Sequence, residues 1–229
     1  MPSERHKKTA APDGPRMLSN ISRCGNFIYD VSDQLRFPQK YVRILKIYKG
    51  GVYMRNVTLM DVFTHPIAQK YLRRSGVAHA IACAYHAYRL AVKAGIDPDI
   101  ATKAALLHDI GHYEWYTDGQ WDYEKYRQND IHAIKGAERA HKLLIRLGEE
   151  PKAAKEIALA ILLHTDSYLP EGDLDKNKLQ QIVKKADELD EEPGGHHHYR
   201  TIDHELALKK IKQLDHMVDK SCSPMKKTV

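Results

Sequence analysis

Residues 104–111 read Ala-Ala-Leu-Leu-His-Asp-Ile-Gly, an apolar helical stretch that ends in two adjacent potential metal ligands. Asp97-Pro98 supplies an N-cap and a first-turn proline upstream, and Gly111 ends the helix, so these signals predict one helix that runs into the His-Asp pair. An ionised Asp109 in this apolar setting is costly to bury unless a cation or strong hydrogen bonds compensate it. Imidazole and carboxylate together suit Mn, Fe and Zn, so a metal ion is the compensation we expect.

Helical spacing continues on both sides of this stretch. Thr58 with Asp61 resembles a capping box, Pro66 breaks or restarts that helix, and Gly95 is placed as the left-handed residue after a helix end. The expected helices cover residues 58–63, 77–94, 98–109, 131–147, 151–164, 179–189 and 203–218. Short turns between them predict an all-α fold in which neighbouring helices are antiparallel.

The chain is long enough for one core domain with extensions. We expect a flexible N-terminal segment (1–26), an N-terminal extension that is either a helix or a β-hairpin (27–56), a helical metal-binding domain (57–220) and a C-terminal tail (221–229). Inside the domain, the polar and aromatic segment 113–129 interrupts the helical pattern. Its length is enough for a loop or lid over whatever the helices surround.

The composition excludes several classes of protein. Hydrophobic residues make up 42% and charged residues 29%, the balance of an ordinary globular chain. No apolar run approaches the ~20 residues needed to span a bilayer, and no signal peptide follows the basic N-terminus, so we expect a cytoplasmic protein without a membrane partner. The three cysteines form no CxxC pair, which argues against disulfides or a zinc knuckle. The net charge of +6 suits a phosphorylated ligand, while scattered basic residues disfavour nucleic acid.

Further ligand-type side chains interrupt apolar helices elsewhere, namely His79, His132, His164 and Asp187. Any one histidine is more simply interpreted as a satisfied core or surface residue. Together with the His-Asp pair, however, they recur on successive helices, which favours a shared metal site. Asp190 lies three residues after Asp187 on a similar helical face, so it is an alternative for the last ligand.

The order His79, then His108-Asp109, then Asp187 resembles the H…HD…D signature of the HD-domain metal-dependent phosphohydrolase superfamily. The likeness is close from His79 to Gly111 and extends over roughly Val57 to Leu214. It implies an HD-domain helical bundle with a metal site between core helices. It also implies an enzyme that cleaves a phosphoester or phosphoanhydride of a small molecule, for which we expect a nucleotide, by metal-activated water.

The resemblance further implies the site residues. The expected metal ligands are His79, His108, Asp109, His132, His164 and Asp187. Asp109 is the expected catalytic residue, which bridges two ions and orients the attacking hydroxide. If a single ion binds, His132 and His164 would instead contact the phosphate or the leaving group. Iron or manganese is the favoured metal, and zinc, cobalt and magnesium are alternatives.

This chain departs from many family members directly after the HD-x-G turn, where it has His112 in place of lysine. His112 can donate a hydrogen bond to a phosphate, or it can support a metal ligand from behind. Lys135 and Arg73 are further candidates for substrate binding. The run His196-His197-His198 follows two glycines and is interpreted as a surface feature.

Two other functions stay open from the sequence. A di-iron oxygenase can use a similar ligand set on an HD fold, and a non-catalytic domain could sense a nucleotide or a metal. A homodimer is open as well, since no heptad seam decides the oligomeric state.

Overall fold

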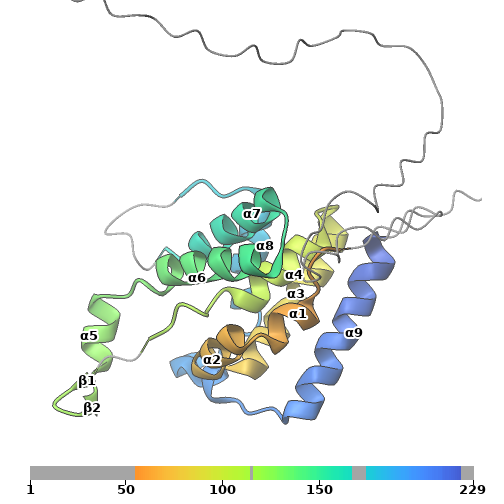
Figure 1. Ribbon diagram of the computed structural model, residues 1–229. Coiled ribbons are helices and arrows are strands. Elements are labelled where there is room, and N and C mark those ends of the chain that lie inside the picture. Colours follow the sequence, from red (N-terminus) through yellow and green to blue (C-terminus); the bar gives the residue numbers. More distant parts are fainter. Residues whose placement is uncertain (1–54, 114–115, 167–173, 223–229) are drawn as a thin grey trace, which may run out of the picture. The chain divides into compact units, whose positions relative to one another are not determined.

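The computed structural model describes residues 55–113, 116–166 and 174–222, all of which belong to one compact unit. The expectations for residues 1–54 and for most of the C-terminal tail lie outside this range. The helices are α1 (Leu59–Thr64), α2 (Pro66–Ser75), α3 (Val77–Ala94), α4 (Pro98–Leu107), α5 (Tyr123–Gln128), α6 (His132–Leu147), α7 (Pro151–Leu162), α8 (Lys178–Glu188), the 3₁₀ segment η2 (Pro193–Tyr199) and α9 (His204–Cys222) (Figure 1). The predicted all-α fold is confirmed.

Local signals set three helix ends where the sequence predicts them, whereas α4 ends at Leu107, so that His108 and Asp109 lie in the turn after it. The Thr58 and Asp61 side chains form a reciprocal capping box at the start of α1. Asp97 accepts a hydrogen bond from Asp99 N at the start of α4. Gly95 ends α3 in the left-handed conformation, with φ 66°, which glycine adopts without a steric penalty.

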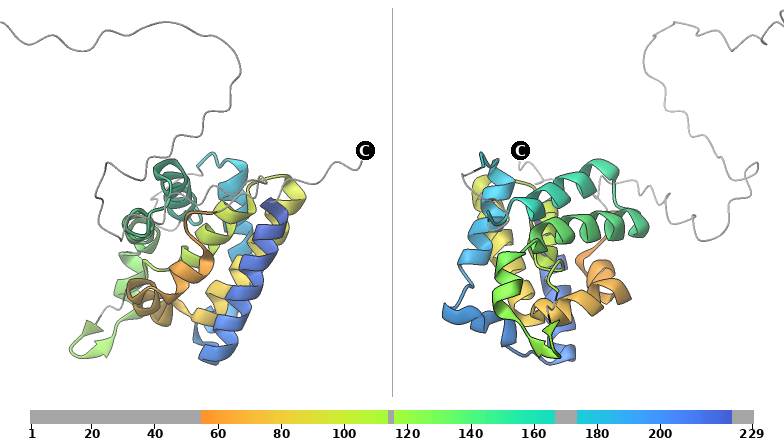
Figure 2. Two further views of the ribbon diagram at one scale, coloured as in Figure 1. Left: turned by 45° about the vertical axis from the view of Figure 1, so that its right-hand side comes forward. Right: turned by 90° about the vertical axis from the view of Figure 1, so that its left-hand side faces the viewer.

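The antiparallel pair α3 and α4 forms the centre of the fold. α8 packs on α3, α7 packs on α4, α6 packs on α7, and α9 runs along α1 and α3 (Figure 2). Many of the buried residues of α3 and α4 are alanines: Ala80, Ala84, Ala87, Ala101 and Ala104 are all fully buried. Alanine lets two helix backbones approach closely, so this pair is the frame on which the site residues are held.

A buried ion-pair network closes the N-terminal end of α4, away from His108. Lys103 Nζ lies 2.6 Å from Asp99 Oδ2 and 2.6 Å from Glu149 Oε2. Asp215 of α9 accepts hydrogen bonds from the first backbone amides of α1, at 2.8 Å from Leu59 N. These four charged side chains therefore all have partners, and the network has the character of structural support.

The segment expected to be a loop or lid is ordered in its described part. β1 (Tyr116–Thr117) and β2 (Gln120–Trp121) form an antiparallel hairpin, and α5 follows. Asp118 and Gly119 at its turn have φ of 52° and 78°, as a two-residue type I′ turn requires. None of the described helices is long and apolar enough to cross a membrane.

Candidate metal centre

The ends of α3, α4, α6, α7 and α8 meet around Asp109. All six predicted ligands lie in this cluster, and five of them are buried: His79, His108, Asp109, His132 and His164. Asp187 is the most accessible, with 29% of its side chain exposed. The structure therefore brings together side chains that are separated by up to about half of the chain.

Four donor atoms form what we call the first half-site: His79 Nε2, His108 Nε2, Asp187 Oδ1 and Asp109 Oδ2. His79 Nε2 lies 3.3 Å from His108 Nε2 and 3.2 Å from Asp187 Oδ1. Asp109 Oδ2 lies 3.2 Å from His108 Nε2 and 3.7 Å from His79 Nε2. Donors at ~2.0–2.2 Å from one ion are roughly 3–3.6 Å apart, so this spacing fits a shared cation.

Three donor atoms form the second half-site: His132 Nε2, His164 Nε2 and the other oxygen of Asp109, Oδ1. The two Nε2 atoms lie 3.1 Å apart. Asp109 Oδ1 lies 3.7 Å from His132 Nε2 and 3.6 Å from His164 Nε2. Asp109 thus offers one oxygen to each half-site, as a bridging carboxylate does.

The hydrogen bonds behind these rings fix which nitrogen faces the cluster. The Nδ1 contacts are His108 to Ala105 O at 2.7 Å, His164 to Ile161 O at 2.6 Å, His79 to Asp190 Oδ2 at 2.8 Å and His132 to Asp130 Oδ1 at 2.7 Å. Carbonyl and carboxylate oxygens accept hydrogen bonds, so Nδ1 carries the proton in each neutral ring and Nε2 is a bare lone pair. Two such lone pairs face each other in each half-site, and a cation is what both can bind.

The alternative between Asp187 and Asp190 has a clear geometric answer. Asp187 faces both imidazoles of the first half-site, at 3.3 Å from His108 Nε2. Asp190 lies on the far side of His79, where it holds Nδ1 and also pairs with Arg200. A carboxylate behind a ligating imidazole orients the ring and raises its basicity.

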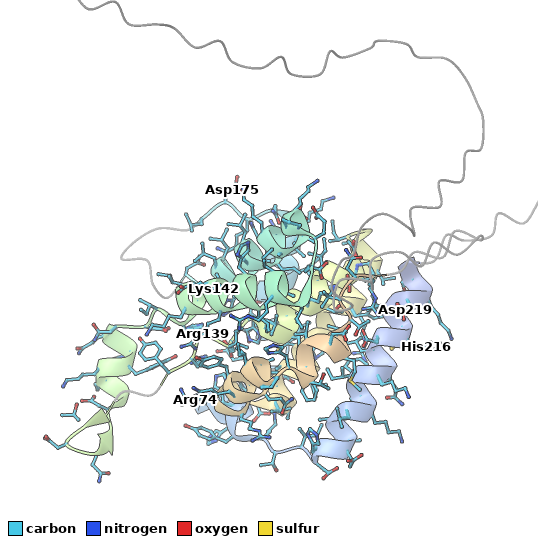
Figure 3. The ribbon with its side chains drawn as sticks, in the orientation of Figure 1. Arg74, Arg139, Lys142, Asp175, His216 and Asp219 are labelled. Carbon is cyan, nitrogen blue, oxygen red and sulfur yellow. The ribbon has the colours of Figure 1, made fainter. Side chains whose placement is uncertain are left out.

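Two glycines let the turn at residues 108–111, which we call the HD turn, contact α6 directly. A Cβ on Gly111 would lie 1.7 Å from His132 O, and a Cβ on Gly136 would lie 3.0 Å from His108 O. Arg139 of α6 also donates to Ile110 O at 2.6 Å. Arg139 and Arg74 are labelled in Figure 3, on α6 and α2. This backbone contact is what brings His132 next to Asp109.

Charge in the cluster shifts the pKa values of its members. Burial would raise the pKa of Asp109, but the nearby imidazoles of His108 and His112 hold it well below its usual range. Burial would lower the pKa of His108, yet Asp109 and Asp187 raise it well above its usual value. Burial raises the pKa of the Cys83 thiol, so this cysteine beside His79 is protonated in the metal-free protein.

The three substrate-binding candidates lie at different distances from the cluster. His112 Nε2 is 3.2 Å from Asp109 Oδ1. Lys135 Nζ lies over the ring of Tyr113, 4.1 Å from its centroid. Tyr113 is the residue that follows His112. Arg73 is exposed in the last turn of α2, and no contact joins it to the cluster among the described residues.

The interpretation of the histidine run as a surface feature is wrong for two of its members. His197 is buried against His79, with ring centroids 4.5 Å apart. His198 Nδ1 lies 2.8 Å from Ser75 O and 3.8 Å from Asp109 Oδ2. A Cβ on Gly76 would lie 2.9 Å from His198 O, so this glycine makes room for η2. The close approach depends on tertiary packing and leaves no local sequence signal.

A helical bundle that converges on a histidine, an HD pair and a final aspartate defines the class of protein. The family model described as HD domain matches residues 76–192, which hold all six predicted ligands, and the chain belongs to this family. The chain is also similar to a protein of Bacillus subtilis (strain 168) named "Putative phosphohydrolase YueE". The two are 83% identical over 176 residues, which cover 77% of this chain and 100% of that protein. No solved structure matches the chain.

Proposed function

We propose that this protein is a two-metal phosphohydrolase that cleaves a phosphoester or phosphoanhydride bond of a small molecule, specifically a nucleotide. The observation that carries the proposal is the pair of half-sites on the two oxygens of Asp109, each with two imidazole lone pairs directed inward. Membership of the HD-domain family and the similarity to a protein named as a phosphohydrolase support the same class.

Each residue has a defined part in this proposal. His79, His108 and Asp187 would hold one ion, His132 and His164 would hold the other, and Asp109 would bridge them. When bound, such ions neutralise phosphate charge and lower the pKa of water. Asp190 and Asp130 keep the imidazoles of His79 and His132 oriented through their Nδ1 atoms. Iron or manganese is the metal we propose, because the donor set is imidazole and carboxylate.

The surroundings of His112 support a nucleotide as the substrate. The rings of Tyr113 and Tyr126 lie beside it, with centroids 5.4 Å apart, and Lys135 lies over Tyr113. Aromatic faces can stack on a base, and a lysine attracts phosphate. Arg73 is a more distant candidate for the same role.

The test combines metal analysis with hydrolysis assays. The full chain would be purified without oxygen and without chelator, its metals counted, and phosphate release measured from p-nitrophenyl phosphate and from nucleoside mono-, di- and triphosphates. We expect close to two ions per chain and hydrolysis of at least one nucleotide. Asp109→Ala should lose both ions and about a thousandfold or more of the activity, because several kcal/mol of charge stabilisation disappear.

The control is Glu138→Ala, which removes an exposed carboxylate of α6 that pairs with Lys142. It should leave metal content and activity unchanged. The proposal fails if Asp109→Ala retains both. Oxygen consumption without phosphate release would identify a di-iron oxygenase, and nucleotide binding without turnover would identify a sensor.

A further inference from the structure

His112 differs from the other imidazoles around Asp109 in the partner of its Nδ1 atom. The hydroxyl of Tyr126 lies 2.5 Å from His112 Nδ1. In the four predicted ligand histidines, the partner of Nδ1 is a carbonyl or carboxylate oxygen, which can only accept. A phenol can donate, and when it donates to Nδ1 the proton of the neutral ring is on Nε2. The nitrogen that faces the cluster is then a donor.

The His112 ring is held in one place. It stacks on His132 with ring centroids 4.4 Å apart and an interplanar angle of 6°. The Tyr126 ring stacks on it from another side, with centroids 5.8 Å apart and an angle of 21°. Its Nε2 atom lies 3.2 Å from Asp109 Oδ1, and 20% of the side chain is exposed. His112 therefore sits at the border between the second half-site and solvent, where a phosphate would enter.

We propose that Tyr126 is a positioning residue: its hydroxyl donates to His112 Nδ1, and this sets His112 Nε2–H as a hydrogen-bond donor. In the metal-free protein that N–H faces Asp109 Oδ1; once an ion occupies this carboxylate oxygen, the N–H would be available to a phosphoryl oxygen of the substrate. The inference rests on the proposed phosphohydrolase function. It separates His112 from the metal ligands, since a protonated Nε2 cannot bind a cation. It also makes α5 part of the substrate site.

Protonation of the His112 ring leaves its Nε2 atom a hydrogen-bond donor. Burial would lower the pKa of His112, but Asp109 raises it. A protonated imidazole carries hydrogen on both nitrogens, so Nε2 donates in that form as well. Tyr126 matters most for the neutral ring, because it excludes the tautomer in which Nε2 is bare.

Nitrogen NMR tests the tautomer without any activity measurement. The zinc-loaded protein, labelled with ¹⁵N in its histidines, would be compared at alkaline pH with Tyr126→Phe, and His112 would be assigned from the signals lost in His112→Gln. We expect the shift pattern of a protonated Nε2 in the unmodified protein and a change toward the other tautomer in Tyr126→Phe. The matched control is Tyr85→Phe, which removes a phenol hydrogen bond to Lys210 O between α3 and α9. It should leave the His112 signals unchanged.

Phosphate binding tests the role. In the manganese-loaded protein, at the alkaline pH used for the NMR comparison, Tyr126→Phe should weaken the binding of inorganic phosphate about tenfold, as expected for a lost hydrogen bond to a charged group. It should also lower kcat/KM for p-nitrophenyl phosphate by a similar factor. Metal content should stay at the wild-type value. His112→Gln should show the same or a larger loss, and the double variant no more than His112→Gln alone, because both changes act on one interaction.

Each contrary outcome has one meaning. The inference is overturned if Tyr126→Phe matches Tyr85→Phe in both the His112 shifts and phosphate affinity. It is also overturned if His112→Gln loses an ion, since His112 would then be a ligand. If the unmodified protein takes up metal but neither binds phosphate nor hydrolyses any ester, the proposed function fails, and the NMR result alone decides whether Tyr126 sets the tautomer.

Discussion

The two half-sites share Asp109 but are built differently. The first lies among α3, α4 and α8, and it combines two imidazoles with oxygens from Asp109 and Asp187. The second lies where α6 and α7 meet the HD turn, and it combines two imidazoles with a single carboxylate oxygen. Because more negative charge surrounds the first position, we expect it to bind its ion more tightly. The second is next to His112, which contacts Tyr126 of α5, so we infer that it faces the substrate.

The largest effect should come from removing one ligand of each half-site separately. Asp187→Ala leaves the first half-site without its own carboxylate, and His164→Ala leaves the second with one imidazole. Hydrolysis should fall by about a hundredfold or more in each case, because in the proposed function both ions would stabilise the reacting phosphate. The metal count should differ: His164→Ala keeps about one ion per chain, whereas Asp187→Ala weakens the tighter position.

The measurement is metal per chain at graded free manganese, together with phosphate release. The contrast between the half-sites breaks down if both variants lose both ions at the same manganese concentration, which would make the cluster one indivisible site. It reverses if Asp187→Ala retains the more tightly bound ion.

A smaller effect should follow from Gly111→Ala, which acts on the second half-site through the backbone. The new Cβ would lie 1.7 Å from His132 O, so α6 must move away from the HD turn. We expect a loss of about 3 kcal/mol in the free energy of unfolding, at the upper end of overpacking costs. We also expect weaker binding of the second ion and little change at the first.

Gly95→Ala is the matched control, measured by urea denaturation and metal titration. Its φ is positive at 66°, unlike that of Gly111, and a Cβ there meets nothing within 4 Å, so only the left-handed strain of about 1–2 kcal/mol is expected. Equal destabilisation of the two variants, or a loss of the first ion in Gly111→Ala, would contradict the backbone contact as the basis of the second half-site.

Local signals explain how much of this arrangement could be predicted. The capping box at Thr58, the N-cap at Asp97 and the left-handed Gly95 are properties of a few adjacent residues, and each confirmed helix end follows from them. The HD pair is conspicuous because charge seldom ends an apolar helix without compensation. The resemblance then points to ligands on helices far apart in the chain.

What could not be predicted depends on packing between distant segments. The sequence places Asp187 and Asp190 on a similar helical face, but α8 ends at Glu188. The two carboxylates contact opposite nitrogens of the His79 ring, and only this tertiary contact tells them apart. His198 contacts Ser75, 123 residues away, through room left by Gly76. The hydroxyl of Tyr126 reaches His112 from a segment with no helical periodicity in its sequence. In each case the deciding contact joins residues far apart in the sequence, and the residues next to them in the chain give no sign of it.

The smallest effect should be the pH dependence of the two ions. In the metal-free protein, Asp109 and Asp187 outweigh burial and raise the pKa of His108 in the first half-site. Burial dominates at His132 in the second half-site and lowers its pKa, although Asp130 works against it. An ion binds neutral imidazole, so at the first half-site it must displace a proton at every pH below the pKa of His108. Its affinity should therefore rise with pH, by at most about tenfold per unit for one proton.

At the second half-site the pKa of His132 is lowered, so this imidazole gives up no proton on metal binding above pH ~6.5. We therefore expect the affinity of that ion to depend less on pH than the affinity of the first. His112 borders this position and its pKa is raised. The metal titrations should therefore be carried out on the His112→Gln variant, in which the charge of His112 no longer contributes. Manganese affinities at pH 6.5, 7.5 and 8.5 decide the matter. A steeper dependence for the second ion than for the first would mean that the proton lost on metal binding does not come from His108, and the electrostatic contrast between the half-sites would be wrong.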